Sequence, residues 1–282
     1  MKKIFFLLFF TGLLTKSFAQ LEVASKENLD AFFKTKTCLV LDENPFSETN
    51  IQLKSAMEKF WKLTSFEIIS TEEYDKRRTS SSFSFVSIDQ VYYEHDKTHT
   101  KYMFICVSLG GNYKTESDMP QLCTLPLAYA DVEEMTYAYK IGTLLIFAQN
   151  HIQTIRNNPA LTKSSIIDYY NKNVGNLQKK TLYLLKEEVE KSLQTEAALK
   201  KIYPYSFKFV TQDEIEQAID NKDPNVVFLH KVGPAKKKGF RCYIFVLGTA
   251  DANIYFYDYH LVNDNTPNAL LEKEIKKMVK KD

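Results

Sequence analysis

The stretch TCLVL at residues 37–41 returns as TLYLL at residues 181–185, an offset of 144 residues. Self-similarity at a nearly fixed spacing is typical of a duplicated structural unit. The sequence therefore predicts two copies of one fold, at residues 37–157 and 181–282. Two further pairs keep the same order at offsets of 141 and 140 residues: STEEY at 70–74 with TQDEI at 211–215, and KYMFI at 101–105 with RCYIF at 241–245.

Each copy reads as strand, helix, strand, helix, three strands and a final helix. We therefore expect a mixed α/β (α+β) fold, a tandem duplication of a two-layer β-α-β-α-β-β-β-α unit. Strands that alternate with helices favour parallel pairing through right-handed crossovers, and the later hairpins add antiparallel strands. With both early helices on one face of each sheet, the other face would need cover, which the second copy can supply.

Helix starts are marked by capping boxes, in which a hydroxyl and a carboxylate satisfy free backbone N–H groups reciprocally. Ser70 with Glu73 and Thr211 with Glu214 occupy matching positions in the two copies. The match favours a common origin for the copies.

Three longer segments complete the predicted organisation. Asp131 with Glu134 forms another box and predicts a long helix over residues 132–157. Helical spacing of apolar residues predicts a helix over residues 187–202. Residues 158–180 are a polar connector between the copies.

The amino-terminal segment has the pattern of a secretory signal peptide: MKK, an apolar run at residues 4–14, and small residues in SFA at 17–19. We expect cleavage before Gln20, which removes residues 1–19 and leaves residues 20–36 as a leader. The apolar run is too short to remain as a span across roughly 30 Å of hydrocarbon. The sequence thus predicts an exported protein, periplasmic or extracellular.

The charge balance bears on possible partners. The chain has 37 basic and 35 acidic residues, and loss of Lys2, Lys3 and Lys16 with the signal leaves 34 and 35. A near-neutral protein lacks the basic surface that binds nucleic acid or anionic membranes. We expect no nucleic-acid partner and no membrane span after cleavage.

The four cysteines are not spaced as a disulfide framework. Cys38, Cys106 and Cys242 each lie in an apolar, strand-like run. Cys106 and Cys123 fall on successive strands of one hairpin, where they could face each other. The sequence leaves open whether they form a disulfide or act as small buried hydrophobic residues.

Tyrosines alternate along the last strand of the second copy. Tyr255, Tyr257 and Tyr259 are expected on one side, with Asp258 and His260 on the other. The tyrosines form either a platform for a sugar or peptide, or an amphipathic surface packed against the other copy or a helix. Asp258 and His260 could act as an acid–base pair or as ligands, although two ligands are too few for a zinc site.

A second polar cluster lies in a hairpin of the first copy. Glu94, His95, Asp96 and His99 have the residue types of a metal site. A solvated loop is the alternative interpretation, because loops collect such residues at the surface.

No catalytic motif appears: there is no glycine-rich phosphate loop, nucleophile elbow or zinc-binding helix signature, and no cofactor is predicted. The strand–helix–strand–helix–strand–strand order is similar to that of small periplasmic α/β domains in envelope assemblies, such as the amino-terminal domain of the Tol-system translocation protein. We expect an exported, non-catalytic binding or envelope-assembly protein with a protein, peptide or envelope-polymer partner. The alternative is a carboxylate-dependent hydrolase with a site between the two repeats.

The signal-peptide assignment predicts a mature amino terminus at Gln20. When the full-length chain is produced in a host with a secretory pathway, the intact mass of the exported protein should match residues 20–282. Replacing Ala19 with Arg should block processing, because signal peptidase requires a small residue there. Exported protein that retains residues 1–19 would contradict the assignment.

Overall fold

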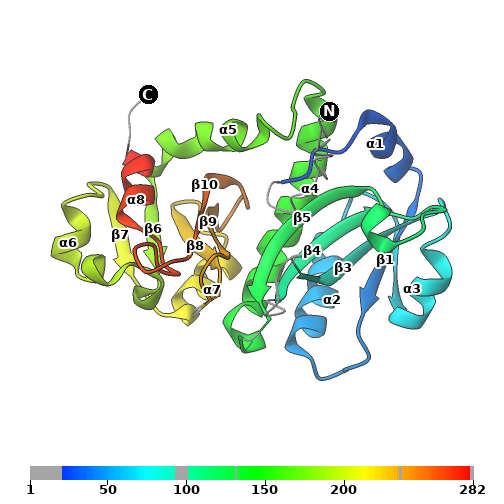
Figure 1. The fold of residues 1–282 in the computed structure, drawn as a ribbon, viewed down its shortest axis with the longest axis horizontal. Helices are drawn as coiled ribbons and strands as arrows, with labels where there is room; N and C mark the ends of the chain where they lie inside the picture. The colour runs from blue at the N-terminus through cyan, green and yellow to red at the C-terminus, as the bar shows by residue number, and fades with distance from the viewer. Residues whose placement is uncertain (1–20, 93–100, 131, 235–236, 280–282) are drawn as a thin grey trace, which may run out of the picture.

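The computed structural model describes residues 21–92, 101–130, 132–234 and 237–279, which contain two five-stranded mixed sheets and eight α-helices (Figure 1). The first half holds α1 (Lys26–Phe32), β1 (Lys36–Leu41), α2 (Glu48–Phe60), β2 (Phe66–Ser70), α3 (Thr71–Arg77), β3 (Phe83–Tyr92), β4 (Lys101–Leu109), β5 (Gln121–Tyr129) and α4 (Ile141–Asn157). The second half holds α5 (Ile166–Asn171), β6 (Thr181–Leu184), α6 (Glu196–Lys200), β7 (Ser206–Phe209), α7 (Gln212–Asp220), β8 (Val226–Val232), β9 (Arg241–Gly248), β10 (Ile254–Leu261) and α8 (Glu272–Val279).

The two sheets share one topology. Their strand orders are β2-β1-β3-β4-β5 and β7-β6-β8-β9-β10. In each, the first strand pairs in parallel with the second and third, and the last two pairings are antiparallel. The predicted mixed α/β fold with two units is confirmed. The duplication itself stays an interpretation of the sequence.

The first two helices of a unit lie on opposite faces of its sheet, not on one face as predicted. Leu39 of β1 packs in the same core as Met57 of α2. The next residue along β1, Cys38, lies on the other face with Phe85, against which Tyr74 of α3 packs edge-on. The chain steps outward from β1 to β2 and then back across β1 to β3. Two right-handed crossovers in opposite directions must place their helices on opposite faces.

Aromatic side chains join the two sheets. The ring of Tyr102 on β4 meets that of Tyr243 on β9 edge-on, with centroids 5.9 Å apart, and Phe104 meets Tyr243 at 6.1 Å. The Tyr102 hydroxyl donates to the carbonyl oxygen of Arg241 at 2.7 Å. One hydrophobic core therefore runs through both units.

The long helix predicted over residues 132–157 is wrong in its first part. Two short 3-10 turns precede α4, which begins at Ile141. The carboxylate that was expected to cap this helix, Glu134, instead accepts hydrogen bonds from the Ser47 hydroxyl and the Thr49 N–H, each at 3.0 Å. It thereby satisfies the amino terminus of α2, where a negative charge is favoured.

The two matching capping boxes differ in detail. Thr211 and Glu214 form the complete reciprocal box at the start of α7. Ser70 accepts the N–H of Glu73 at the start of α3, but the Glu73 carboxylate pairs with Arg77 at 2.9 Å. The Thr211 box is confirmed in full. The Ser70 box is confirmed only for the hydrogen bond that its hydroxyl accepts.

The helix predicted over residues 187–202 is also wrong. Val189 forms a parallel bridge with Leu270, and the N–H of Leu270 donates to the carbonyl of Glu188 at 2.8 Å. This extended segment divides the region into 3-10 turns and the short helix α6. The long-range bridge thus outweighs the local helical periodicity.

The connector runs along the outer edge of β10. The Asn171 side-chain amide accepts the N–H of Tyr257 at 2.7 Å and donates to the Tyr257 carbonyl at 2.9 Å. Asn173 donates to the carbonyl of Ile254 at 2.9 Å. These side chains pair with a strand edge that would otherwise leave its backbone groups unpaired.

All four cysteines are buried free thiols. Cys106 pairs with Thr124, whereas Cys123 pairs with Val107, the next residue along β4. Adjacent positions point to opposite faces of a sheet, so the two thiols do not face each other.

Because Tyr102 packs between the two sheets, its substitution should lower the free energy of unfolding. Tyr102→Phe should lower the free energy of unfolding by about 1 kcal/mol, because it removes one hydrogen bond. Tyr102→Ala should lower it by about 3–5 kcal/mol by leaving a cavity between the sheets. Urea unfolding measures both. The matched control Tyr259→Phe, at a partly exposed ring, should change it by less than about 0.5 kcal/mol, and equal effects at Tyr102 and Tyr259 would refute the assignment.

Candidate functional site

The predicted tyrosine stripe is interrupted by a bulge. The pairing of β10 with β9 skips Tyr255, so this ring packs in the second unit's own core and its hydroxyl donates to Asp251 at 2.9 Å. Tyr257 lies in the core shared by both units and stacks on Phe245 at 4.4 Å. Tyr259 is 37% exposed. The expectation that all three rings share one side is therefore wrong, and two of the three are buried.

Asp258 and His260 both contact α8. Asp258 pairs with Lys277, and His260 Nδ1 lies 2.7 Å from a Glu274 carboxylate oxygen. His260 Nε2 lies 2.8 Å from the Pro267 carbonyl oxygen. Both neighbours accept hydrogen bonds, so the ring carries two protons. Burial opposes this charge, but hydrogen bonds with the Cys242 thiol and the Glu274 carboxylate raise the pKa of His260 to about 10. In this arrangement both side chains hold α8 on the sheet.

The predicted metal cluster Glu94, His95, Asp96 and His99 lies outside the described residues. Within the part of the chain that is described, no group of three or more histidine, cysteine or carboxylate side chains is arranged to hold a metal ion.

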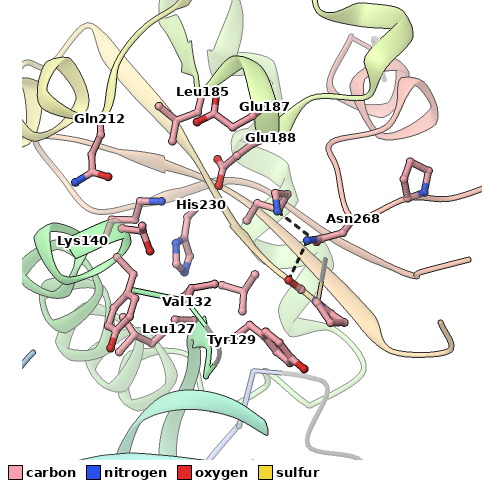
Figure 2. Close-up of a pocket in the computed structure, with 18 of the residues that line it drawn as sticks. Leu127, Tyr129, Val132, Lys140, Leu185, Glu187, Glu188, Gln212, His230 and Asn268 are labelled. Carbon is pink, nitrogen blue, oxygen red and sulfur yellow. Dashed lines mark hydrogen bonds between the residues drawn. The ribbon is translucent and has the colours of Figure 1, made fainter. Parts of the chain in front are cut away.

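A cleft of about 770 Å³ lies between the two units (Figure 2). Its walls come from the end of β5 and the turns before α4 in the first unit, and from β8, the loop after β6 and the turn around Asn268 in the second. In Figure 2 the side chains of Lys140, Glu188 and His230 point toward a common space at its centre. These three residues form the candidate site.

Lys140 ends the 3-10 turn that leads into α4 and is only 3% exposed. Its Nζ lies 5.1 Å from the centroid of the Tyr139 ring, and within the described residues no hydrogen bond or ion pair reaches it. Burial lowers the pKa of the Lys140 amine, and the charge of Glu188 opposes this shift. A lysine is easily shifted in this way because its charge is compact and strongly hydrated.

His230 lies on β8 and reaches across the boundary between the units. Its Nε2 donates to the carbonyl oxygen of Pro126 on β5 at 2.8 Å. Burial, together with the nearby charge of Lys140, lowers the pKa of His230 to about 3, so the ring is neutral. A neutral ring that donates through Nε2 has a lone pair on Nδ1, and Nδ1 is buried without a partner among the described residues.

Glu188 is placed by the bridge between Val189 and Leu270 described above. Its backbone carbonyl accepts the N–H of Leu270, which fixes the segment after β6 against the segment that precedes α8. Carboxylate oxygen Oε2 is buried and has no hydrogen-bond partner among the described residues. The site therefore combines one donor, Lys140, with two acceptors, Glu188 and His230.

Several other polar side chains of the cleft are already engaged, whereas Glu187 is exposed at its rim. Lys231 Nζ donates to the Asn268 side-chain oxygen at 3.3 Å, and Asn268 donates to the Gly233 carbonyl at 2.9 Å (Figure 2). Gln212 donates to the carbonyl of Met135 at 2.7 Å on the opposite wall. Among the described residues of the cleft, the buried acceptors without a hydrogen bond, Glu188 Oε2 and His230 Nδ1, thus lie at its centre.

The sequence did not indicate this site. Lys140 appears as a charge beside an apolar helix, and His230 appears among apolar neighbours, as a structural histidine would. Glu188 falls in a segment with helical periodicity. The three residues meet only because the two units pack together, and the signal that pointed toward them was the general expectation of a site between the repeats.

No match was found to a family model, to a curated protein or to a solved structure. Of the helices in the described ranges, none is both long and apolar enough to cross a membrane.

The neutral state of His230 predicts acid sensitivity. Its pKa in the folded protein, about 3, lies below the value of about 6.5 in the unfolded chain, so only the unfolded chain gains a proton as the pH falls below 6.5. This should cost about 2 kcal/mol of stability by pH 5. His230→Gln should remove that part of the loss in urea unfolding measured near pH 7 and pH 5.

His260→Gln is the matched control for this measurement. The raised pKa of His260 gives a stabilisation that is complete below pH 6.5 and is lost as the pH rises toward 10. This variant should therefore keep the acid-dependent loss between pH 7 and pH 5. The same loss in His230→Gln as in the unaltered protein would show that His230 is not buried as a neutral ring.

Proposed function

We propose that this is an exported, non-catalytic binding protein that holds a peptide or an envelope polymer in the cleft between its two α/β units. The predicted signal peptide supports export. The cleft supports binding, because a volume of about 770 Å³ lies within the usual range of ligand pockets, about 300–1,000 Å³.

The observation that carries the proposal is the group of unpartnered polar atoms at the centre of the cleft. Glu188 Oε2 and His230 Nδ1 are both buried without partners in the part of the chain that the structure describes, and Lys140 Nζ faces the same space. Each buried polar group without a hydrogen bond costs about 1–3 kcal/mol. A ligand with its own donors and an acceptor would recover this loss on binding.

The rim of the cleft favours a peptide-like ligand. Val132, which lines the cleft, is 43% exposed, and its neighbour Met135 is 62% exposed. Backbone amides of a peptide can pair with the central polar groups, while apolar side chains can lie against this rim. A peptide combines both properties, as does a peptide-containing envelope polymer.

A hydrolase is the second candidate, because Glu188 and His230 lie between the units, where the sequence predicts such a site. The Glu188 carboxylate can accept a proton from an attacking water, and the lone pair on His230 Nδ1 can accept a hydrogen bond that orients it. Substrate turnover, and not binding alone, separates the two functions.

A peptide-binding measurement tests the proposal. The purified protein is applied to an array of immobilised seven-residue peptides, and affinities of the retained sequences are determined by calorimetry. Glu188→Gln keeps the shape of the side chain and removes its charge, so we expect affinity to fall about tenfold, which is 1.4 kcal/mol.

Glu196→Gln supplies the matched control, since Glu196 is an exposed carboxylate on α6 that does not line the cleft. It should change the affinity by less than about twofold. Absence of peptide binding, or equal losses in the two variants, would reject the proposed site. Peptide cleavage that Glu188→Gln abolishes would support the hydrolase.

A further inference from the structure

The amine of Lys140 is buried in surroundings that do not favour a positive charge. The residue sits at the amino terminus of α4, a helix of 17 residues with no acidic residue in its first turn. The amino-terminal end of a helix carries partial positive charge, which disfavours a cation there. A lysine at this position, 3% exposed and without an ion pair among the described residues, is in a setting whose burial favours the neutral amine, while the charge of Glu188 acts against it.

A neutral amine is a nucleophile, and buried lysines of this kind form imines with carbonyl compounds. The other two groups of the site have the properties this chemistry needs. Among the described residues, Glu188 Oε2 and His230 Nδ1 are unpartnered acceptors in the same cleft, and the Glu188 carboxylate can take protons from nitrogen and return them to oxygen. Lys231, by contrast, already donates to Asn268 and is not available in the same way.

We propose that Lys140 forms a reversible imine with an aldehyde or ketone group of a ligand bound in the cleft. The inference rests on the proposed function in one respect, namely that this cleft admits a ligand. It adds a covalent step and a ligand class that peptide binding does not require.

The step balances without an oxidant or reductant. The lone pair of Lys140 Nζ attacks the carbonyl carbon, a C–N bond forms, and the carbonyl electron pair moves to oxygen. Glu188 accepts the two protons of the nitrogen in turn and passes each to the oxygen, which leaves as water while the nitrogen lone pair forms the second C–N bond. The product is a C=N bond between Lys140 and the ligand, and addition of water reverses the reaction.

Reductive trapping tests this inference. The purified protein is incubated near pH 7 with sodium cyanoborohydride and either glyceraldehyde or pyruvate, which represent a sugar-type aldehyde and a keto acid. Tryptic peptides are then quantified by mass spectrometry. We expect Lys140 to be modified at least about tenfold faster than Lys237, a lysine on the wall of the same cleft, with at least one of the two probes.

The carboxylate variants supply the second readout. Glu188→Gln should slow modification of Lys140 by about tenfold and leave the rate at Lys237 unchanged, because it removes a proton acceptor from the site. Glu196→Gln, which alters an exposed carboxylate outside the cleft lining, should change neither rate. Modification of Lys140 no faster than that of Lys237 with both probes would overturn the inference.

The two proposals fail separately. Peptide binding without selective trapping at Lys140 would leave the binding function standing and reject the imine. Selective trapping without peptide binding would support the reactive lysine and reject a peptide ligand.

Discussion

Tyr102 packs edge-on against Tyr243 where the two sheets face one another, and the position of the cleft depends on this contact. The Tyr102 ring also meets Tyr129 at 5.9 Å, and Tyr129 forms part of the cleft wall. One side chain therefore takes part in both the junction of the units and the wall of the site. Aromatic rings suit this position because their edges and faces fix the angle at which two surfaces meet. The separation of Lys140 from His230 is set by how the two units are joined.

Elsewhere in the molecule, the carboxylates of Glu134 and Glu274 have hydrogen-bond partners. Glu134 caps α2 from the other end of its unit, and Glu274 pairs with a protonated His260 while also accepting the N–H of Leu271 at 2.9 Å. Among the described residues, some unpartnered buried atoms, such as those of Gln121 and Tyr203, lie outside the cleft. The cleft differs because two unpartnered acceptors and a buried amine face one space. Such a concentration of unmet hydrogen bonds is typical of a site that function maintains.

Much of the fold could be predicted from the sequence, because strand runs and the Thr211 capping box depend on neighbours within a few residues. Features set by distant contacts could not. The bridge between Val189 and Leu270 replaces a helix, and Glu134 caps a helix far away in the sequence. The bulge at Tyr255 breaks an alternation that looked regular in sequence.

The candidate site was beyond sequence reasoning for a similar reason. Lys140 and His230 both stand among apolar neighbours, which is also how ordinary core residues appear. Glu188 resembles any carboxylate of a surface helix. Only the packing of one unit against the other reveals that the three residues share a desolvated space. The expectation of a site between the units named the place but none of its residues.

The pairing of Asn171 with Tyr257 has a consequence for self-association. The outer edge of β10 presents backbone donors and acceptors onto which a strand from another molecule could add, the first step toward a continuous intermolecular sheet. The Asn171 amide occupies both backbone groups of Tyr257 as a peptide group of a neighbouring strand would, and Asn173 takes up the carbonyl of Ile254. The segment that links the two units thus also covers the edge of the second sheet. By doing so it prevents β10, a strand rich in tyrosine and phenylalanine, from pairing with a strand of another molecule.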